Sequence, residues 1–131
     1  MLEPRILTPT VESPEVTLDP NNLARLAVGF ASDKKAEDIL MMDIHSLSSI
    51  ADYFVICTGT SDRQVRAVAK EIQEQLRLRG ARPLHIEGVE AANWILLDYG
   101  AVIVHIFDPA TRDYYRLEKL WAEAPRVLVV Q

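Results

Sequence analysis

The sequence has little that would support a membrane-spanning, disulfide-bonded or strongly basic protein. It contains a single cysteine, Cys57, which excludes an internal disulfide and is typical of a reducing compartment. No apolar run approaches the roughly 20 residues that a helix needs to span a bilayer. Acidic residues outnumber basic ones by 19 to 14, so the chain does not suit binding to nucleic acid mainly by neutralising phosphates. These absences favour a cytoplasmic protein that binds another protein.

The N-terminal segment lacks the features of a targeting peptide. Residues 1–18 carry three prolines among Thr, Ser and Glu, and they contain no apolar core of the kind found in signal peptides. They predict a flexible tail. The remaining length fits one compact domain.

Alternating helix and strand patterns fill the rest of the chain. Asp19-Pro20 and Asp108-Pro109 each pair an N-cap with proline at the first helical position, which predicts two helix starts. A longer helix is expected from Ser61 to Gly80. The expected strands are Asp38–Ile44, Tyr53–Thr58, Leu84–Glu87, Trp94–Tyr99 and Ala101–Phe107, the last two forming a hairpin at Gly100. This order predicts an α/β fold, a single domain with a mixed sheet of about five strands and flanking helices.

The turn Gly59-Thr60-Ser61 lies between a strand and a helix, where many proteins bind phosphate. Backbone N–H groups at a helix N-terminus attract anions. However, the chain has neither G-x-x-x-x-G-K-[ST] nor G-x-G-x-x-G. The structural interpretation, in which Gly59 reverses the chain and Ser61 caps the helix, is therefore favoured over phosphate binding.

Candidates for catalytic and metal chemistry are isolated. A nucleotidyltransferase would need two acids spaced D-x-D after such a turn, and the next strand offers only Glu87. His85 and Glu87 spell the H-x-E of zinc deaminases, but the required P-C-x-x-C segment is missing. His105 lies in an apolar strand, where a neighbour usually satisfies it. No cofactor or metal is expected.

The expected hairpin is apolar on both faces. Trp94 and Leu96 point to one side of the first strand, and Ile95, Leu97 and Tyr99 point to the other. Both faces of the second strand are apolar as well. Two interpretations remain open at this point: helices cover the whole hairpin, or a partner buries part of it through Trp94.

Two stretches of the chain, KKAEDILMMDIHSLSSIADYFVICTGTSDRQVRAVAKEI and IEGVEAANWILLDYGAVIVHIFDPATRDYYRLEKLW, resemble the ribosomal silencing factor (Iojap-like) family. The similarity extends from about Leu23 to Trp121. It implies one domain over residues 19–122, with residues 123–131 as a C-terminal tail. The markers are specific in combination. They are Lys35–Asp38 (K-A-E-D), Ser49–Tyr53 (S-I-A-D-Y), Cys57–Ser61 (C-T-G-T-S), Glu87-Gly88, the W-x-x-x-D-x-G run that starts at Trp94, Val104-His105, and finally Tyr115, Leu117, Glu118 and Trp121.

The resemblance implies a non-enzymatic translational repressor. Members of the family bind the large ribosomal subunit on its fourteenth large-subunit protein and sterically block the small subunit, notably when nutrients are short. Their fold is similar to that of nucleotidyltransferases without the metal-binding acids. Carried onto this chain, the docking tryptophan is Trp94, and we extend the expected partner-binding face to Leu96, Asp98, Tyr99, Gly100, Val102 and Val104.

Two alternatives stay open beside this hypothesis. One is a nucleotide-binding, transferase-like protein that uses the Gly59–Ser61 turn. The other is a dimerisation module that uses the hairpin, since the resemblance also admits a homodimer of the free protein. Neither membrane binding nor primary nucleic-acid binding is expected.

Overall fold

The computed structural model describes residues 18–131, so the expected N-terminal tail lies almost wholly outside the described residues. Within these residues, four helices and six strands follow one another along the chain. The helices are α1 (Pro20–Asp33), α2 (Asp62–Leu78), α3 (Pro109–Tyr115) and α4 (Leu117–Leu120). The strands are β1 (Glu37–Asp43), β2 (Tyr53–Thr58), β3 (His85–Glu87), β4 (Trp94–Asp98), β5 (Val102–Phe107) and β6 (Arg126–Val130).

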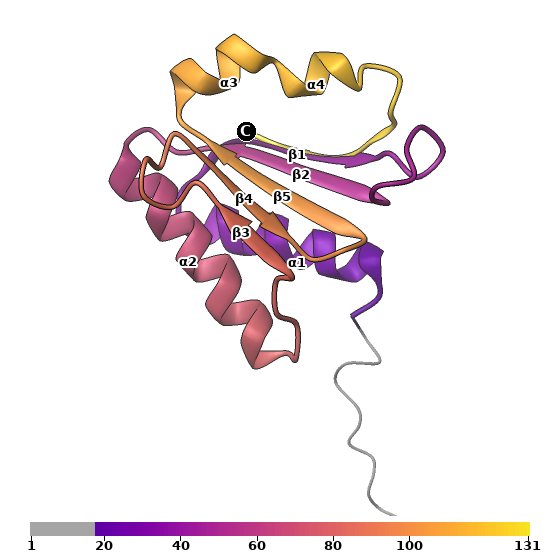
Figure 1. Ribbon diagram of the computed structural model, residues 1–131, viewed down its shortest axis with the longest axis horizontal. Helices are drawn as coiled ribbons and strands as arrows, with labels where there is room; N and C mark the ends of the chain where they lie inside the picture. Colours follow the sequence, from indigo (N-terminus) through magenta and orange to yellow (C-terminus); the bar gives the residue numbers. More distant parts are fainter. Residues whose placement is uncertain (1–17) are drawn as a thin grey trace, which may run out of the picture.

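The strands form one mixed sheet in the order β3-β4-β5-β2-β1-β6. Strands β2 and β5 run parallel, and every other neighbouring pair is antiparallel. Helices α1 and α2 cover one face of the sheet, and α3 and α4 cover part of the other (Figure 1). The α/β class and the mixed sheet predicted from the sequence are confirmed.

Helix caps follow the predicted chemistry. The Asp19 carboxylate accepts a hydrogen bond from the N–H of Asn22 at 2.8 Å, and Asp108 accepts one from the N–H of Thr111 at the same distance. Ser61 Oγ accepts one from the N–H of Gln64. Each side chain satisfies a donor that the first helical turn leaves open, which fixes where the helix starts.

Each face of the sheet has its own apolar core. The larger core, on the α1/α2 face, contains Val55, Ile95 and Val104 from the central strands and Val68 and Ile72 from α2. The smaller core, on the α3/α4 face, is built around Phe54, Ile56 and Phe107, with Leu117 and Trp121 packed against it. The central strands are buried on both sides, which is why their sequences read as continuous apolar runs.

A sixth strand lies within the expected C-terminal tail. Strand β6 pairs antiparallel with β1, placing Leu40 opposite Val129 and Met41 opposite Leu128. Leu128 and Val130 pack against the larger core. Without β6, strand β1 would present an open edge of unpaired backbone groups. The apolar VLVV run after Pro125 supplies the missing edge strand, so the sheet has one strand more than the sequence predicted.

Candidate partner-binding face

The register of the β4–β5 hairpin decides which predicted residues share a surface. Trp94 lies opposite Phe107, Leu96 opposite His105, and Asp98 opposite Ile103. Because directly opposed residues point to the same face of a sheet, these six side chains all lie on the α3/α4 face. Three predicted site residues, Trp94, Leu96 and Asp98, are therefore brought together, and each is partly exposed.

Trp94 lies at the centre of an aromatic cluster. Its ring centroid is 4.8 Å from that of Phe107 and 4.9 Å from that of Tyr115, and its indole Nε1–H donates to His105 Nδ1 at 3.1 Å. The hydrogen bond and the two ring contacts hold the indole in one orientation while part of its surface stays open. A rigid, half-exposed aromatic of this kind is the side chain that most often anchors a protein interface.

His105 supports Trp94 from within the smaller core. Its side chain is 4% exposed, and burial lowers its pKa to about 3. To accept from Trp94, Nδ1 must be unprotonated, so the neutral ring carries its hydrogen on Nε2. The expectation that a neighbour satisfies this strand histidine is confirmed for Nδ1. His105 Nε2 has no partner among residues 18–131.

The turn after β4 uses Asp98 and Gly100 structurally. Asp98 Oδ1 accepts a hydrogen bond from the N–H of Gly100 at 2.7 Å, and Gly100 has φ +88°. One carboxylate oxygen is thus committed to the turn. The Tyr99 side chain packs against the larger core, on the opposite side of the sheet from Trp94, and burial raises its pKa to about 12.

Val102 and Val104 do not belong to an exposed face. They are 1% and 0% exposed and lie in the larger core beneath α1 and α2. The period of two in a strand identified two faces of the hairpin, but placing these valines on the same side as Trp94 was wrong, because β5 places its even-numbered residues on the α1/α2 face.

Tyr115 is a contributor that sequence reasoning missed. It is 49% exposed, lies at the end of α3, and its ring contacts that of Trp94 at an interplanar angle of 51°. Tyr114, Leu117 and Trp121 have helical spacing in the sequence and would share one face if the helix that starts at Asp108-Pro109 were continuous. Arg116 has φ +48° and separates α3 from α4, so the helical period is interrupted and Tyr114 is left 80% exposed. The adjacent Tyr114-Tyr115 pair, two large aromatics in a short polar helix, was the available signal.

We refer to Trp94, Leu96, Ile103 and Tyr115, with Asp98 at the edge, as the Trp94 face. Gly88, directly after β3, packs against the backbone of Trp94. Gly88 has φ +86°, and a Cβ there would lie 2.0 Å from the carbonyl oxygen of Trp94. Only glycine allows the β3–β4 loop to approach the backbone of Trp94 this closely.

Comparison with known proteins identifies the family of this chain. Residues 17–131 match the family model described as ribosomal silencing factor during starvation. The chain belongs to the ribosomal silencing factor family. It is 44% identical over 108 residues to the ribosomal silencing factor RsfS of Bacillus subtilis, covering 82% of this chain and 92% of that protein.

Relatives of the family also occur in organelles and among solved structures. A mouse protein named mitochondrial assembly of ribosomal large subunit protein 1 is 33% identical, with 73% of this chain and 43% of that protein covered. A crystal structure of a Chromobacterium violaceum protein superposes with a TM-score of 0.78 at 37% identity, covering 80% of this chain and 88% of that one. A Bacillus halodurans structure gives a TM-score of 0.73 at 41% identity, with 82% and 98% covered.

In this member of the family, the Gly59–Ser61 turn has few donors left for an anion. The N–H of Gly59 donates to the carbonyl of Phe107 at 2.8 Å, and both the N–H and the hydroxyl of Thr60 donate to Gln64 Oε1. Asp62 adds a negative charge to the first turn of α2. The donors of Gly59 and Thr60 are thus already hydrogen-bonded within the protein, which disfavours phosphate binding at this turn.

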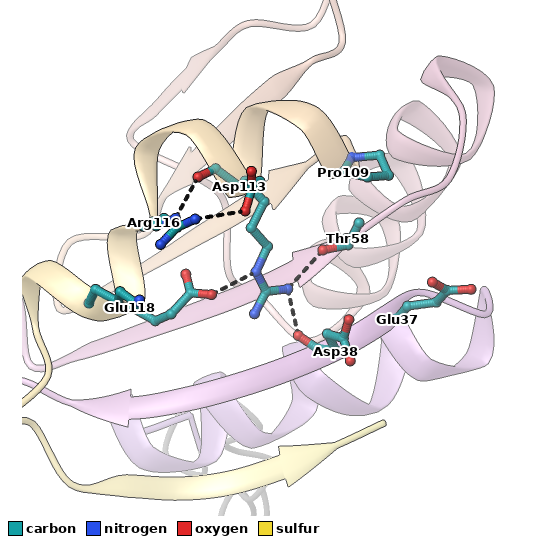
Figure 2. Close-up of a pocket in the computed structure, with 9 residues that line it drawn as sticks. Glu37, Asp38, Thr58, Pro109, Asp113, Arg116 and Glu118 are labelled. Atoms are coloured by element: carbon teal, nitrogen blue, oxygen red, sulfur yellow. Dashed lines mark hydrogen bonds and ion pairs between the residues drawn. The ribbon is translucent and has the colours of Figure 1, made fainter.

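A pocket of about 400 Å³ opens between α3 and the ends of β1 and β2, near the same turn. Arg112 fills its base: Nη1 donates to the carbonyl of Asp38 at 2.7 Å and to Thr58 Oγ1 at 2.8 Å, while Nε pairs with Glu118 at 3.2 Å. These three partners surround the guanidinium (Figure 2). The arrangement joins α3 and α4 to the sheet.

Three further features were sought in the described residues: a metal site, a reactive thiol and a membrane-spanning helix. Within residues 18–131, no group of three or more His, Cys, Asp or Glu side chains could hold a metal ion. Cys57 is fully buried, and desolvation raises the pKa of its thiol to about 12, so the nucleophilic thiolate does not form at neutral pH. Over the same residues, no helix is both long and apolar enough to cross a bilayer.

Proposed function

We propose that this protein represses translation in the cytoplasm by binding the large ribosomal subunit through that subunit's fourteenth protein. The bound factor occupies the subunit-joining surface and sterically excludes the small subunit. The protein acts by occupancy, with no catalytic step. Family membership supports the ribosomal role, and the observation that carries the docking site is the half-exposed Trp94 held by His105 and Tyr115.

The physical basis is burial of a rigid aromatic anchor. Trp94 is already fixed by its hydrogen bond and ring contacts, so little side-chain entropy is lost when a partner covers it. Leu96 adds aliphatic area two residues along β4, and Ile103 adds more at the far end of the hairpin on β5. Removing one such anchor typically costs about 2 kcal/mol or more of binding free energy, which corresponds to at least a roughly tenfold loss of affinity.

Replacement of the anchor tests the proposal. We expect Trp94→Ala to weaken co-sedimentation with purified large subunits by at least about tenfold, and to restore subunit joining measured by light scattering. Val129→Ala on β6 is a matched control, since it also truncates an exposed apolar side chain, but on the opposite edge of the sheet. Circular dichroism checks that both variants fold. A folded Trp94→Ala variant that blocks joining as well as the parent would remove the Trp94 face from the proposal.

The nucleotide-binding alternative is weaker because Gly59 and Thr60 use their N–H donors within the fold. Calorimetric titration with ATP and magnesium tests it directly, and we expect no heat of binding. A homodimer of the free protein through the Trp94 face would compete with ribosome docking. Sedimentation of the parent and Trp94→Ala would reveal it as a loss of dimer in the variant.

A further inference from the structure

The basic side chains of this acidic protein are unevenly distributed. The segment 62–82, which comprises α2 and the loop after it, contains six Lys or Arg residues and three acidic ones, whereas the rest of the chain has 16 acidic and 8 basic residues. Four of the six, Arg63, Arg66, Lys70 and Arg77, have helical spacings of three, four and seven residues. They therefore follow one stripe about 20 Å long on the side of α2 that faces away from its buried residues.

Part of this stripe borders a groove between α2 and β3. The groove has a volume of about 430 Å³ and is lined by Lys70, Arg77 and Arg82 together with Gln73, Glu74 and Ile86. Within residues 18–131, none of these three cations has an ion pair or side-chain hydrogen bond. By contrast, Arg66 donates to the carbonyls of Val89 and Glu90, and Arg79 lies over the Phe30 ring, so both serve the fold.

We propose that this groove binds the phosphate backbone of ribosomal RNA. Three unpaired cations against a single lining carboxylate favour a polyanion, and their linear arrangement suits a chain of phosphates better than one small anion. The inference rests on the proposed docking to the large subunit, whose surface contains RNA. The overall charge of −5 keeps the contact local, so it supplements docking at the Trp94 face and does not replace it.

The position of the groove allows both contacts at once. Among the strands that the structure describes, β3 is at the edge of the sheet, and its only neighbour is β4, which carries Trp94. The groove lies on the α1/α2 side of this edge, whereas the Trp94 face lies on the other side of the sheet and begins on the adjacent strand β4. Figure 1 shows α2 and β3 side by side at this end of the molecule. A ribonucleoprotein surface that encloses the β3 edge can therefore present protein to Trp94 and RNA to Lys70, Arg77 and Arg82.

Charge reversal in the full chain tests the assignment. The groove variant is Lys70→Glu, Arg77→Glu and Arg82→Glu; the control variant, Lys34→Glu, Lys119→Glu and Arg126→Glu, changes the net charge equally at exposed positions elsewhere. Binding of each fluorescently labelled chain is titrated with intact large subunits and with protein-free large-subunit RNA. For intact subunits, we expect the groove variant to lose at least about tenfold in affinity and to reduce the salt-dependence slope by about 2 to 3. It should also bind the free RNA more weakly than the control variant does.

The outcomes separate this inference from the proposed function. A groove variant that matches the parent in affinity and salt slope overturns the RNA contact, whereas Trp94→Ala should still lose affinity with its slope unchanged. If the groove variant weakens binding to intact subunits but not to free RNA, the groove takes an acidic protein and the RNA assignment is wrong. If Trp94→Ala binds normally while the groove variant does not, the docking face fails and the groove stands.

Discussion

At the scale of single residues, the most informative side chain is His105. It combines a buried position, a hydrogen bond accepted from Trp94 and a pKa lowered to about 3. The ring is therefore neutral throughout the physiological range and keeps its acceptor for Trp94 at any pH that the cell experiences. Histidine often serves as a pH switch, but this one provides an unchanging support for the anchor.

His105 should nevertheless make stability depend on pH. In the unfolded chain the imidazole binds a proton below its ordinary pKa of 6.5, whereas in the folded protein it does so only near 3. The free energy of unfolding should thus fall as the pH drops from 6.5 toward 3, by at most about 1.4 kcal/mol per pH unit from this group. His105→Gln retains an amide that can accept from Trp94 but does not titrate. Urea denaturation at several pH values should show a shallower slope for the variant, and equal slopes would contradict the assignment.

At the scale of elements, α3 and α4 depend on Arg112. These helices are short, with seven and four residues, and have no fully buried side chains of their own. Arg112, whose side chain is 13% exposed, ties them to β1 and β2 through Asp38 and Thr58 and to each other through Glu118. The same helices carry Tyr115 to the Trp94 ring. Arg112 and these three partners, which we call the Arg112 clamp, thus position one wall of the proposed docking face.

Loss of the Arg112 contacts should destabilise both α3 and α4. We expect Arg112→Met to lower the free energy of unfolding by about 2 kcal/mol, since it leaves Glu118 partly buried without its cation. Hydrogen exchange should accelerate in residues 109–120 more than in α1 or α2. Combining Arg112→Met with Glu118→Gln should recover part of the loss, because the orphaned charge is then absent. Unchanged exchange in 109–120 would show that apolar packing alone holds the helices.

Most elements could be predicted from local sequence chemistry, and the exceptions share a physical cause. Caps such as Asp19 and Ser61 and the central apolar strands depend on near neighbours, so their patterns are visible in the sequence. Strand β6 depends on an open edge of β1, which lies far earlier in the chain, so no local pattern reveals it. The side of the sheet that Val102 and Val104 occupy is likewise decided by which face α1 and α2 cover.

At the scale of the whole molecule, one sheet separates two cores of unequal size. Both tryptophans, Trp94 and Trp121, pack against the smaller core on the α3/α4 face, whereas most helical residues belong to α1 and α2 on the other face. Strands β1, β2 and β5 have buried side chains on both faces, so loss of either core should disrupt the other.

The two faces should accordingly unfold together. Tryptophan fluorescence reports the smaller core and far-ultraviolet circular dichroism reports mainly α1 and α2. Because the cores share their strands, we expect the two urea transitions to coincide, as for a two-state domain. A fluorescence transition at lower urea, with the dichroism unchanged, would instead show that the α3/α4 layer detaches as a separate unit.

The contact between Gly88 and the carbonyl of Trp94 affects how any mutational map of docking must be interpreted. Gly88→Ala would push the backbone that carries the indole out of position, although residue 88 need not meet the ribosome at all. A binding screen would then score Gly88 beside Trp94 as an equally severe loss. Gly88 would score because it fixes the backbone of Trp94, and not because it contacts the partner. The residues that contact the partner would therefore be fewer than the positions sensitive to mutation.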